Sequence, residues 1–358
     1  MRKYYTRPCN FYYGSNARKL IKNKKAYSLA GNPDIAFDQL EIFQRKKKGK
    51  TLSNIYSITE IKDLNKEIKR PIKADLKKII SKRENICGLK FDNPKIMGVL
   101  NVTPDSFSDG GLFFEEKKAN DQIKQMLKDG ATIIDIGGES TRPGSQTITE
   151  ASEWSRINII IAEFKKNFPE AILSLDTRKS QVMINGIKNG VDIINDISGL
   201  NFDKKSFDVV KSKQIPLILH HMQGTPNTMQ QNPTYDDVLL DIFDFFESKI
   251  NFFIQKNYKK KLIILDPGIG FGKNLEHNLK LISKVSTFHS LGFPILLGTS
   301  RKRFIEHIVT KFDTPDRTGG TLASVLYGLL QGVQLFRVHN VKEINQGILV
   351  FNKILNTN

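Results

Sequence analysis

From residue 95 onward, short apolar runs alternate with helix-length amphipathic stretches, and the alternation repeats eight times. The apolar runs are Ile96–Asn101, Thr132–Gly138, Ile172–Thr177, Ile193–Gly199, Pro216–Met222, Leu262–Gly268, Pro294–Ser300 and Val333–His339. Strands buried on both faces read as continuous apolar runs, and strands separated by helices pair in parallel. Eight such units in about 265 residues match the size of a (β/α)8 barrel, or TIM barrel. We therefore predict an α/β fold with this barrel at residues 91–358; an open, doubly wound sheet is the alternative.

Polar side chains stand at the end of each predicted strand. They are Asn101, Asp135, Asp176, Asn195, His220 with His221, Asp266, Ser300, and Arg337 with His339. In a parallel barrel these ends meet on one face, where active sites are built. One such residue is often only a helix cap, but eight strands ending in this way predict a polar site. We do not expect His220 and His221 to share a metal ion, because adjacent strand residues point to opposite faces.

Residues 1–90 differ in charge from the rest of the chain. They hold 23 of the 55 Lys and Arg residues but 8 of the 37 Asp and Glu residues, a net charge of +15, whereas the remainder carries +3. We interpret them as a small basic N-terminal α/β extension of unknown function, with strands at 35–43 and 51–58. Helices are predicted at 59–69 and 73–83, separated by Pro71 because proline disrupts helix interiors.

The basic extension is predicted to present a solvated face. A polyanion-binding face is the alternative, but we do not expect a nucleic acid partner, since the excess charge is confined to one quarter of the chain. No motif in the extension indicates chemistry. We expect it to dock on the amino-terminal end or the outer helices of the barrel, far from the polar face.

Several classes of protein are excluded. The chain has no uninterrupted apolar run of about 18 residues, which a membrane-spanning helix requires. Its two cysteines, Cys9 and Cys87, are too few for a disulfide scaffold. The first residues lead into no apolar segment typical of a secretion signal. These features predict a soluble cytoplasmic protein with no membrane partner.

Seven segments of the predicted barrel resemble, in order, the motifs of the dihydropteroate synthase family. NVTPDSFSDGG at 101–111 is similar to the first family signature and DIGGESTRPG at 135–144 to the second. The others are SLDT at 174–177, INDI at 194–197, LDPGIGFGK at 265–273, GTSRK at 298–302 and RVH at 337–339. One such string is weak support, whereas seven in register, each on a different predicted strand, make a strong resemblance.

The resemblance implies a reaction. The family joins p-aminobenzoate to 7,8-dihydropterin-CH2-pyrophosphate, releasing pyrophosphate and forming dihydropteroate in folate biosynthesis. These small molecules would be the partners, Mg²⁺ the cofactor, sulfonamides the inhibitors, and a homodimer a possible assembly. Two alternatives stay open: a pterin-binding methyltransferase on the same barrel, which has no use for the Ser300–Lys302 and Arg337/His339 clamps, and a catalytically silent pterin-binding paralogue.

The resemblance also assigns roles to residues. The pterin ring, which presents N–H donors to carboxylates, would be bound by Asp176, Asn195, Met222, Asp266 and Lys302, with Val99 as an apolar wall. The pyrophosphate, which attracts cations and N–H donors, would be bound by Asn101, Thr141, Arg142, Arg337 and His339. Asn101 would also be the Mg²⁺ ligand. The p-aminobenzoate pocket would contain Phe107, Pro143, Phe271 and Ser300.

The expected catalytic residues are Asp109, Asp176 and Lys302. Pyrophosphate would leave first, giving a pterin cation that Asp109 stabilises, or Asp109 would take the proton of the attacking amine. The chain departs from the family at Asn340, where an acidic residue is common after the histidine. That departure leaves the tautomer of His339 open.

Overall fold

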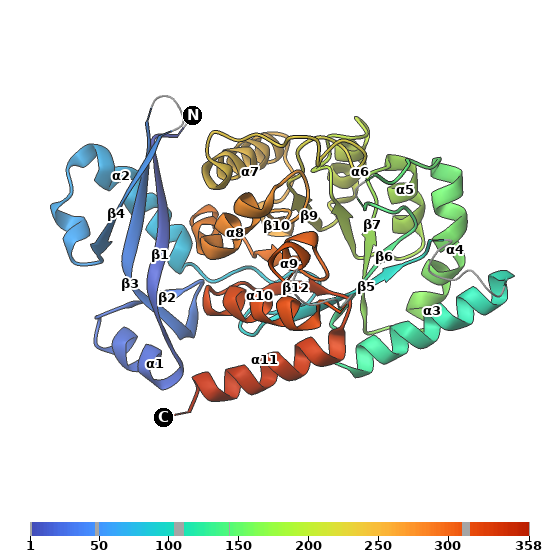
Figure 1. The fold of residues 1–358 in the computed structure, drawn as a ribbon, viewed down its shortest axis with the longest axis horizontal. Coiled ribbons are helices and arrows are strands. Elements are labelled where there is room, and N and C mark those ends of the chain that lie inside the picture. The colour runs from blue at the N-terminus through green and yellow to red at the C-terminus, as the bar shows by residue number, and fades with distance from the viewer. Residues whose placement is uncertain (1, 47–49, 104–110, 143, 310–315, 358) are drawn as a thin grey trace.

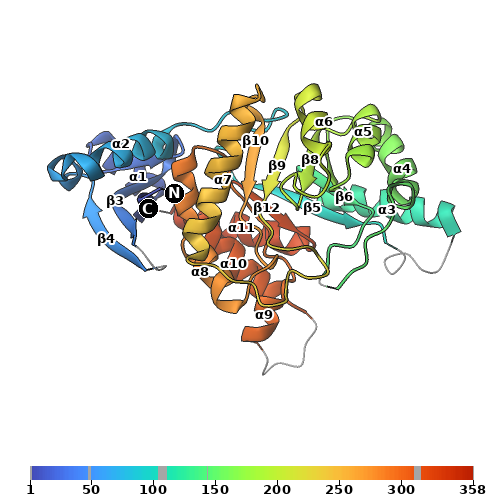
Figure 2. The same cartoon turned by 90° about the horizontal axis from the view of Figure 1, so that it is seen from above.

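A computed structural model describes residues 2–46, 50–103, 111–142, 144–309 and 316–357, with the backbone alone for residues 111–115. A four-stranded antiparallel sheet with two helices lies beside an eight-stranded parallel sheet surrounded by helices (Figure 1). The N-terminal sheet stands at one side of the barrel in two perpendicular views (Figure 2). No described helix is long and apolar enough to cross a membrane.

Eight parallel strands form the barrel, as the apolar runs predict. They are β5 (Lys95–Asn101), β6 (Ile133–Gly137), β7 (Ile172–Asp176), β8 (Ile193–Asp196), β9 (Leu217–His220), β10 (Ile263–Asp266), β11 (Leu296–Leu297) and β12 (Leu335–Val338). Their order in the sheet is β10-β9-β8-β7-β6-β5-β12-β11. A parallel bridge between Leu265 and Ile295 brings β10 to β11, so the sheet closes into a barrel.

Helices connect the strands along the outside of the barrel. They are α3 (Gly111–Lys128), α4 (Glu150–Asn167), α5 (Ser180–Lys188), α6 (Ser206–Lys213), α7 (Val238–Gln255), α8 (Leu275–Ser283), α9 (Arg303–Ile308), α10 (Thr318–Leu330) and α11 (Val341–Leu355), with short 3-10 turns η4 (Lys260–Leu262) and η5 (Val285–Leu291). Together with the strands they give the predicted (β/α)8 barrel.

The barrel interior changes from apolar to polar along the strands. One layer of interior side chains is apolar: Met97, Ile133, Ile172, Ile193, Ile218, Ile264, Leu296 and Leu335. Ile86, Leu89 and Phe91 join this cluster and cover the amino ends of the strands. Alternate residues of a strand share a face, so the next interior layer contains Val99, Asp135, Ser174, Asn195, His220, Asp266, Gly298 and Arg337. The interior therefore becomes polar toward the carboxyl ends.

The extension contains more structure than its sequence predicts. Its elements are β1 (Tyr4–Tyr13), α1 (Gly14–Lys22), β2 (Tyr27–Leu29), β3 (Asn32–Arg45), β4 (Thr51–Ser57), η2 (Glu60–Asp63) and α2 (Lys66–Ile80). The two predicted strands correspond to β3 and β4. The strand β1 was not predicted; it pairs along almost the whole of β3, from Tyr4 opposite Gln44 to Tyr13 opposite Ile35.

The prediction that Pro71 separates two helices is wrong. Helix α2 runs through Pro71 without a break. Proline removes one hydrogen bond, to the carbonyl of the residue four positions earlier, and here that residue is the exposed Glu67. The buried Ile72 and Ile79, two turns apart on the helix, pack in the core of the extension and keep the helix continuous.

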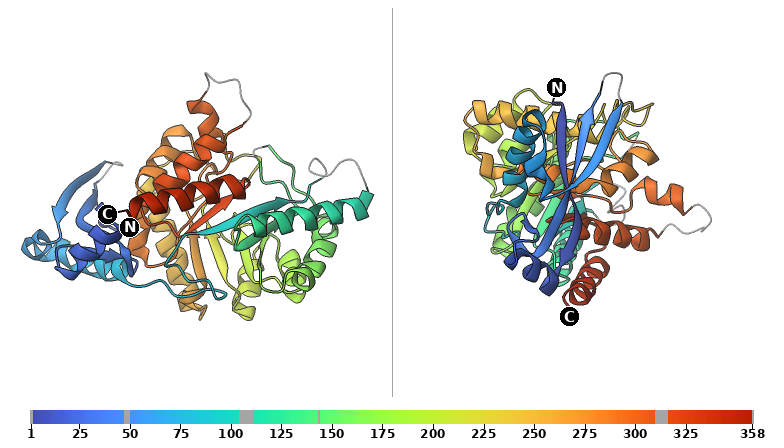
Figure 3. Two further views of the ribbon diagram at one scale, coloured as in Figure 1. Left: turned by 90° about the horizontal axis from the view of Figure 1, so that it is seen from below. Right: turned by 90° about the vertical axis from the view of Figure 1, so that its left-hand side faces the viewer.

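The extension docks on the outer helices of the barrel, and its sheet covers this side (Figure 3, right). Tyr5 packs edge-to-face on Phe243 of α7 at 5.2 Å, and Tyr13 Oη donates to the Leu330 carbonyl at the end of α10. The expectation that the whole extension lies far from the polar face of the barrel is wrong at one contact. Thr51 Oγ1 donates to Asp237, the N-cap of α7, and this end of α7 lies on the side of the barrel where β9 ends.

Candidate active site

A salt-bridged network joins three strands, β6, β7 and β12, inside the polar end of the barrel. Arg337 Nε donates to Asp135 Oδ2 (2.6 Å), and Arg337 Nη2 donates to Asp176 Oδ2 (2.7 Å). Burial raises the pKa of Asp176 to about 7, although the Arg337 charge opposes this shift. Burial would lower the pKa of Arg337, but Asp135 and Asp176 together raise it. The guanidinium therefore stays charged and fixes both carboxylates.

Asn195 offers an open acceptor beside this network. Its Nδ2 donates to Asp135 Oδ2 (3.0 Å), which fixes the orientation of the amide. Its Oδ1 is buried and has no hydrogen-bond partner among the described residues. Because an unpaired buried acceptor is costly, this oxygen is suited to receive an N–H from a ligand, as the predicted pterin contact requires.

Asp266 faces the same interior from β10. Its Oδ1 accepts the Gly268 N–H (2.8 Å). Gly268 has a positive φ of 70°, and a Cβ at this position would clash with the His221 carbonyl oxygen at 1.9 Å. Its Oδ2 lies 3.9 Å from His220 Nε2. Burial raises the pKa of Asp266 to about 6, so the group is mainly a carboxylate at neutral pH.

The two adjacent histidines diverge, as expected for neighbouring strand residues. The His220 ring contacts Phe271 edge-on at 4.6 Å, whereas the His221 ring packs on Phe245. Burial, and next the Lys273 charge, lower the pKa of both rings well below 6.5. Both rings are therefore neutral.

Lys302 and Phe271 form one wall of the site. Lys302 Nζ lies 4.0 Å from the centre of the Phe271 ring, a cation–π contact. Burial and the Arg337 charge lower the pKa of Lys302 to about 8, against the carboxylates Asp266 and Asp176. Met222 packs in a small cluster with Phe271, Ile197 and Met229. The residues predicted to bind the pterin are therefore brought together, and Phe271, which the sequence assigned to the p-aminobenzoate pocket, lies among them.

His339 lies among positive charges. Burial, and then the charges of Arg337, Arg301, Lys302 and Arg142, lower its pKa to about 3, so the ring is neutral. Ser300 Oγ accepts the His339 backbone N–H (3.2 Å) and lies 3.0 Å from His339 Nδ1. The hydroxyl hydrogen is thus available to Nδ1, which favours the tautomer with its proton on Nε2. Asn340 instead accepts from Arg301 Nε (3.0 Å).

The remaining predicted residues lie on the segments after β5 and β6. Asn101 is the last residue of β5, partly exposed and paired with Gly137. Thr141 is partly exposed and Arg142 is exposed. Phe107, Asp109 and Pro143 lie outside the described residues.

The residues that hold the segment after β6 were not predicted from the sequence. Glu139 Oε2 accepts from Arg178 Nε, and its Oε1 from Lys179 Nζ, both at 2.8 Å. Oε1 also accepts the Ile148 N–H (3.1 Å), and Arg178 Nη2 donates to Thr147 Oγ1 (2.9 Å). The buried Glu139 thus joins both ends of the segment that carries Thr141 and Arg142. The useful signal was the pair Arg178–Lys179 directly after a strand end.

The expected Mg²⁺ ion would take most of its oxygen ligands from a substrate and from water. No described group of three His, Cys, Asp or Glu side chains is arranged to hold a metal, and Asp135 and Asp176 are bonded to Arg337. Mg²⁺ often takes one or two protein ligands together with waters and substrate phosphates. The neutral amide of Asn101 fits that role.

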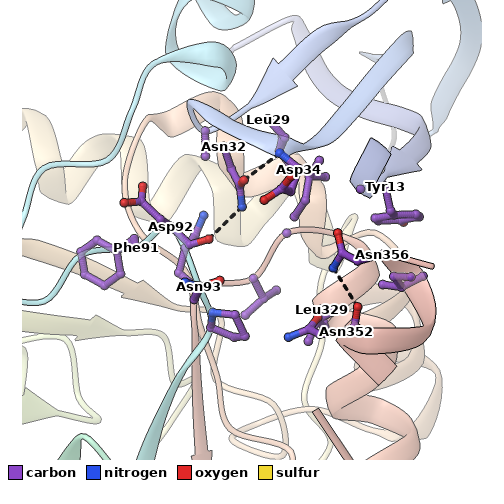
Figure 4. A pocket seen from close by; sticks show the side chains of 18 residues that line it. Tyr13, Leu29, Asn32, Asp34, Phe91, Asp92, Asn93, Leu329, Asn352 and Asn356 are labelled. Carbon is purple, nitrogen blue, oxygen red and sulfur yellow. Dashed lines mark hydrogen bonds between the residues drawn. The ribbon is translucent and has the colours of Figure 1, made fainter. Parts of the chain in front are cut away.

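A hollow lies between the extension and the barrel (Figure 4). Asn93, Pro94, Val333 and Gln334 line it and lie just before or at the start of β5 and β12, so the hollow is at the amino ends of the strands. Its Asn32 is already bonded: Nδ2 donates to the Asp92 carbonyl and Oδ1 accepts the Asp34 N–H. We therefore place the active site at the carboxyl ends.

A parallel barrel with buried carboxylates, an open amide oxygen and a lysine at its carboxyl end defines a class of heterocycle-binding enzymes. The family model described as "Pterin binding enzyme" matches residues 97–339. The Bacillus subtilis dihydropteroate synthase is 41% identical over 263 residues, covering 73% of this chain and 88% of the relative. The chain belongs to the dihydropteroate synthase family.

Solved structures agree with this assignment. A Yersinia pestis dihydropteroate synthase in complex with a sulfonamide drug has a TM-score of 0.70 and 38% identity, covering 75% of this chain and 97% of its own. A Xanthomonas albilineans dihydropteroate synthase with 4-aminobenzoic acid has a TM-score of 0.71 and 33% identity, covering 77% and 99%. The two matches cover nearly the whole of each solved chain. The family model begins at residue 97, so it does not include the extension.

Proposed function

We propose that this chain joins p-aminobenzoate to 7,8-dihydropterin-CH2-pyrophosphate at the carboxyl ends of its barrel strands. One observation carries the proposal: in the polar barrel interior, the buried Oδ1 of Asn195 has no hydrogen-bond partner among the described residues, and Asp266 and Lys302 face the same space. The amidine edge of a pterin supplies the N–H donors that Asn195 and Asp266 would accept. The relative bound to 4-aminobenzoic acid supports the second substrate.

The pterin ring would lie between the carboxylates and the wall formed by Lys302 and Met222. Asp266 would accept from the amidine edge, Asn195 Oδ1 and Asp176 from ring N–H groups, and Lys302 would donate to the ring carbonyl. These contacts need charged carboxylates and a charged lysine, which the pKa values near 6, 7 and 8 allow together only around neutral pH.

The pyrophosphate would be bound by the cations near His339. The C–O bond to the exocyclic methylene breaks, the electron pair leaves with pyrophosphate, and the amine nitrogen then bonds to that carbon and loses a proton. Arg142 and the Nε2–H of His339 would stabilise the charge that develops on the leaving oxygen, with Thr141 and Arg337 nearby. Asp109 would stabilise the pterin cation or accept the amine proton.

The p-aminobenzoate would occupy a pocket made by Phe107, Pro143, Phe271 and Ser300. Asn101 would hold Mg²⁺, which supplies charge neutralisation to the pyrophosphate when bound. A homodimer is part of the proposal, and the exposed apolar residues Tyr327 on α10 and Leu349, Val350 and Ile354 on α11 support it. The cytoplasmic location stays a prediction.

A turnover assay with both substrates tests the proposal. We expect pyrophosphate release that depends on p-aminobenzoate and forms dihydropteroate in equal amount. A chain that binds the pterin pyrophosphate but releases no pyrophosphate would be the silent paralogue. Turnover with a methyl donor in place of p-aminobenzoate would indicate the methyltransferase.

A further inference from the structure

An acidic row on α7 faces the basic extension. Asp237, Asp241, Asp244 and Glu247 are spaced by four, three and three residues, so they lie along one face of the helix. Each accepts a hydrogen bond from the extension: Asp237 from Thr51 (2.7 Å), Asp241 from Arg45 (2.7 Å), Asp244 from Tyr5 (2.9 Å) and Glu247 from Arg2 (3.0 Å). The row therefore gives part of the extension's positive charge a partner on the barrel.

Arg45 is central to this contact. Its side chain is only 10% exposed and bridges two carboxylates, since Nη1 donates to Asp241 Oδ1 and Nη2 donates to Asp244 Oδ2 (3.2 Å). Its Nε donates to Tyr5 Oη (3.2 Å). Arginine can join several acceptors in one plane, which lysine cannot.

The same carboxylates hold the chain just before α7. Asp237 Oδ1 accepts the Leu239 N–H (3.1 Å) as the N-cap. Asp241 Oδ2 accepts the N–H groups of Asp236 (2.9 Å) and Asp237 (3.2 Å). Arg45 and Thr51 thus bind the two side chains that fix the end of the segment 222–236.

This segment leads directly to the active site. Tyr235 Oη donates to the Gly272 carbonyl (2.8 Å), and Gln230 Nε2 donates to the Gly270 carbonyl (2.7 Å), on either side of Phe271. At its other end, the segment begins with Met222, which packs in the cluster with Phe271. The Pro226 carbonyl accepts the Gly144 N–H (3.1 Å) from the segment that carries Arg142.

We infer that the extension positions the substrate pocket: Arg45 and Thr51 hold the N-terminal end of α7, and thereby the segment 222–236 against Phe271. Arg45 is a positioning residue, not a catalytic one, because it acts through Asp241 and contacts no substrate. The inference rests on the proposed function for the identity of the pocket. The contacts that connect Arg45 through α7 to the segment 222–236 do not depend on it.

Arg45→Met tests the inference in the full chain, with Arg7→Met as the matched control. Arg7 is also a mostly buried arginine of the extension (13% exposed), but its described ion pair is with Glu41 and its described inter-element hydrogen bond is with Ser286 of η5, not with α7. We expect both variants to lose stability. Only Arg45→Met should raise KM for p-aminobenzoate and the pterin substrate, by roughly three- to thirtyfold, with a smaller change in kcat. Arg45→Lys should restore part of the loss.

Hydrogen–deuterium exchange of residues 222–237 gives a readout that needs no substrate. Arg45→Met should speed exchange there, and Arg7→Met should not. If Arg45→Met does not fold, Thr51→Val removes one hydrogen bond of the same contact and serves instead. Equal exchange and equal KM in the two arginine variants would overturn the inference. Faster exchange in a protein without dihydropteroate synthase turnover would instead overturn the proposed function alone.

Discussion

Replacing Glu139 by glutamine should strongly destabilise the fold. The substitution keeps the size of the side chain and removes a charge bound by Arg178 and Lys179. All three side chains are 3–4% exposed, so water cannot replace the lost interaction. Breaking a buried ion pair from one side costs about 3–5 kcal/mol. We expect the free energy of unfolding to fall by this amount at neutral pH.

Glu153→Gln is the matched control, because Glu153 binds the same Lys179 at 2.5 Å. Its other oxygen, Oε1, has no partner among the described residues, and burial raises its pKa. The fold therefore does not favour the charged form of Glu153. When Glu153 is neutralised, Lys179 still has its ion pair with Glu139. The control should lose about 1 kcal/mol, the worth of one hydrogen bond.

Urea denaturation of the three proteins across pH measures the effect. Burial alone would raise the pKa of Glu139, but hydrogen bonds from Arg178 and Lys179 lower it below 4.5. A lowered pKa in the folded state means that the carboxylate stabilises the protein above its unfolded pKa and ceases to do so as the pH falls through the folded value. The difference between wild type and Glu139→Gln should therefore shrink in acid. Equal losses in both variants, or a difference unchanged by acid, would refute the reasoning.

Three further predictions concern the substrates. Asp266→Asn should replace an acceptor by a donor at the amidine edge and cost on the order of 2–4 kcal/mol of pterin affinity by calorimetry; wild-type affinity would remove Asp266 from the pterin site. Asn101→Ala should raise the Mg²⁺ concentration needed for turnover while circular dichroism stays unchanged, and an unaltered Mg²⁺ dependence would contradict the metal assignment. In wild type, kcat/KM should rise with pH as Asp266 and Asp176 lose protons near pH 6 and 7, and fall as Lys302 loses its charge near pH 8. In Lys302→Met, the fall of kcat/KM near pH 8 should be absent. If this fall persists in the variant, it is caused by another group and the assignment to Lys302 is wrong.

The sequence predicted the barrel well because strands buried on both faces leave a local record. Each run of apolar residues is a property of one short segment, so the eight strands and their parallel order could be found without long-range information. The extension was predicted less well. Its strand β1 contains Tyr, Arg, Asn and Pro in place of a clear alternation, and it is a strand because it pairs with β3, more than twenty residues away along most of its length.

The candidate site divides in the same way. Period-two alternation places Asp135, Asp176, Asn195, Asp266 and Arg337 in the barrel interior, so the sequence alone determined which side chains meet there. Only the tertiary structure decided how they pair. Arg337 binds a carboxylate 202 residues away, and Asn195 keeps its carbonyl oxygen open because its amide nitrogen donates to the same group. The contact between Arg45 and α7 was likewise absent from any local pattern, since it joins residues 196 positions apart. Strand periodicity is set by the neighbours of a residue in the chain, whereas ion pairs are set by the packing of elements that the sequence keeps far apart.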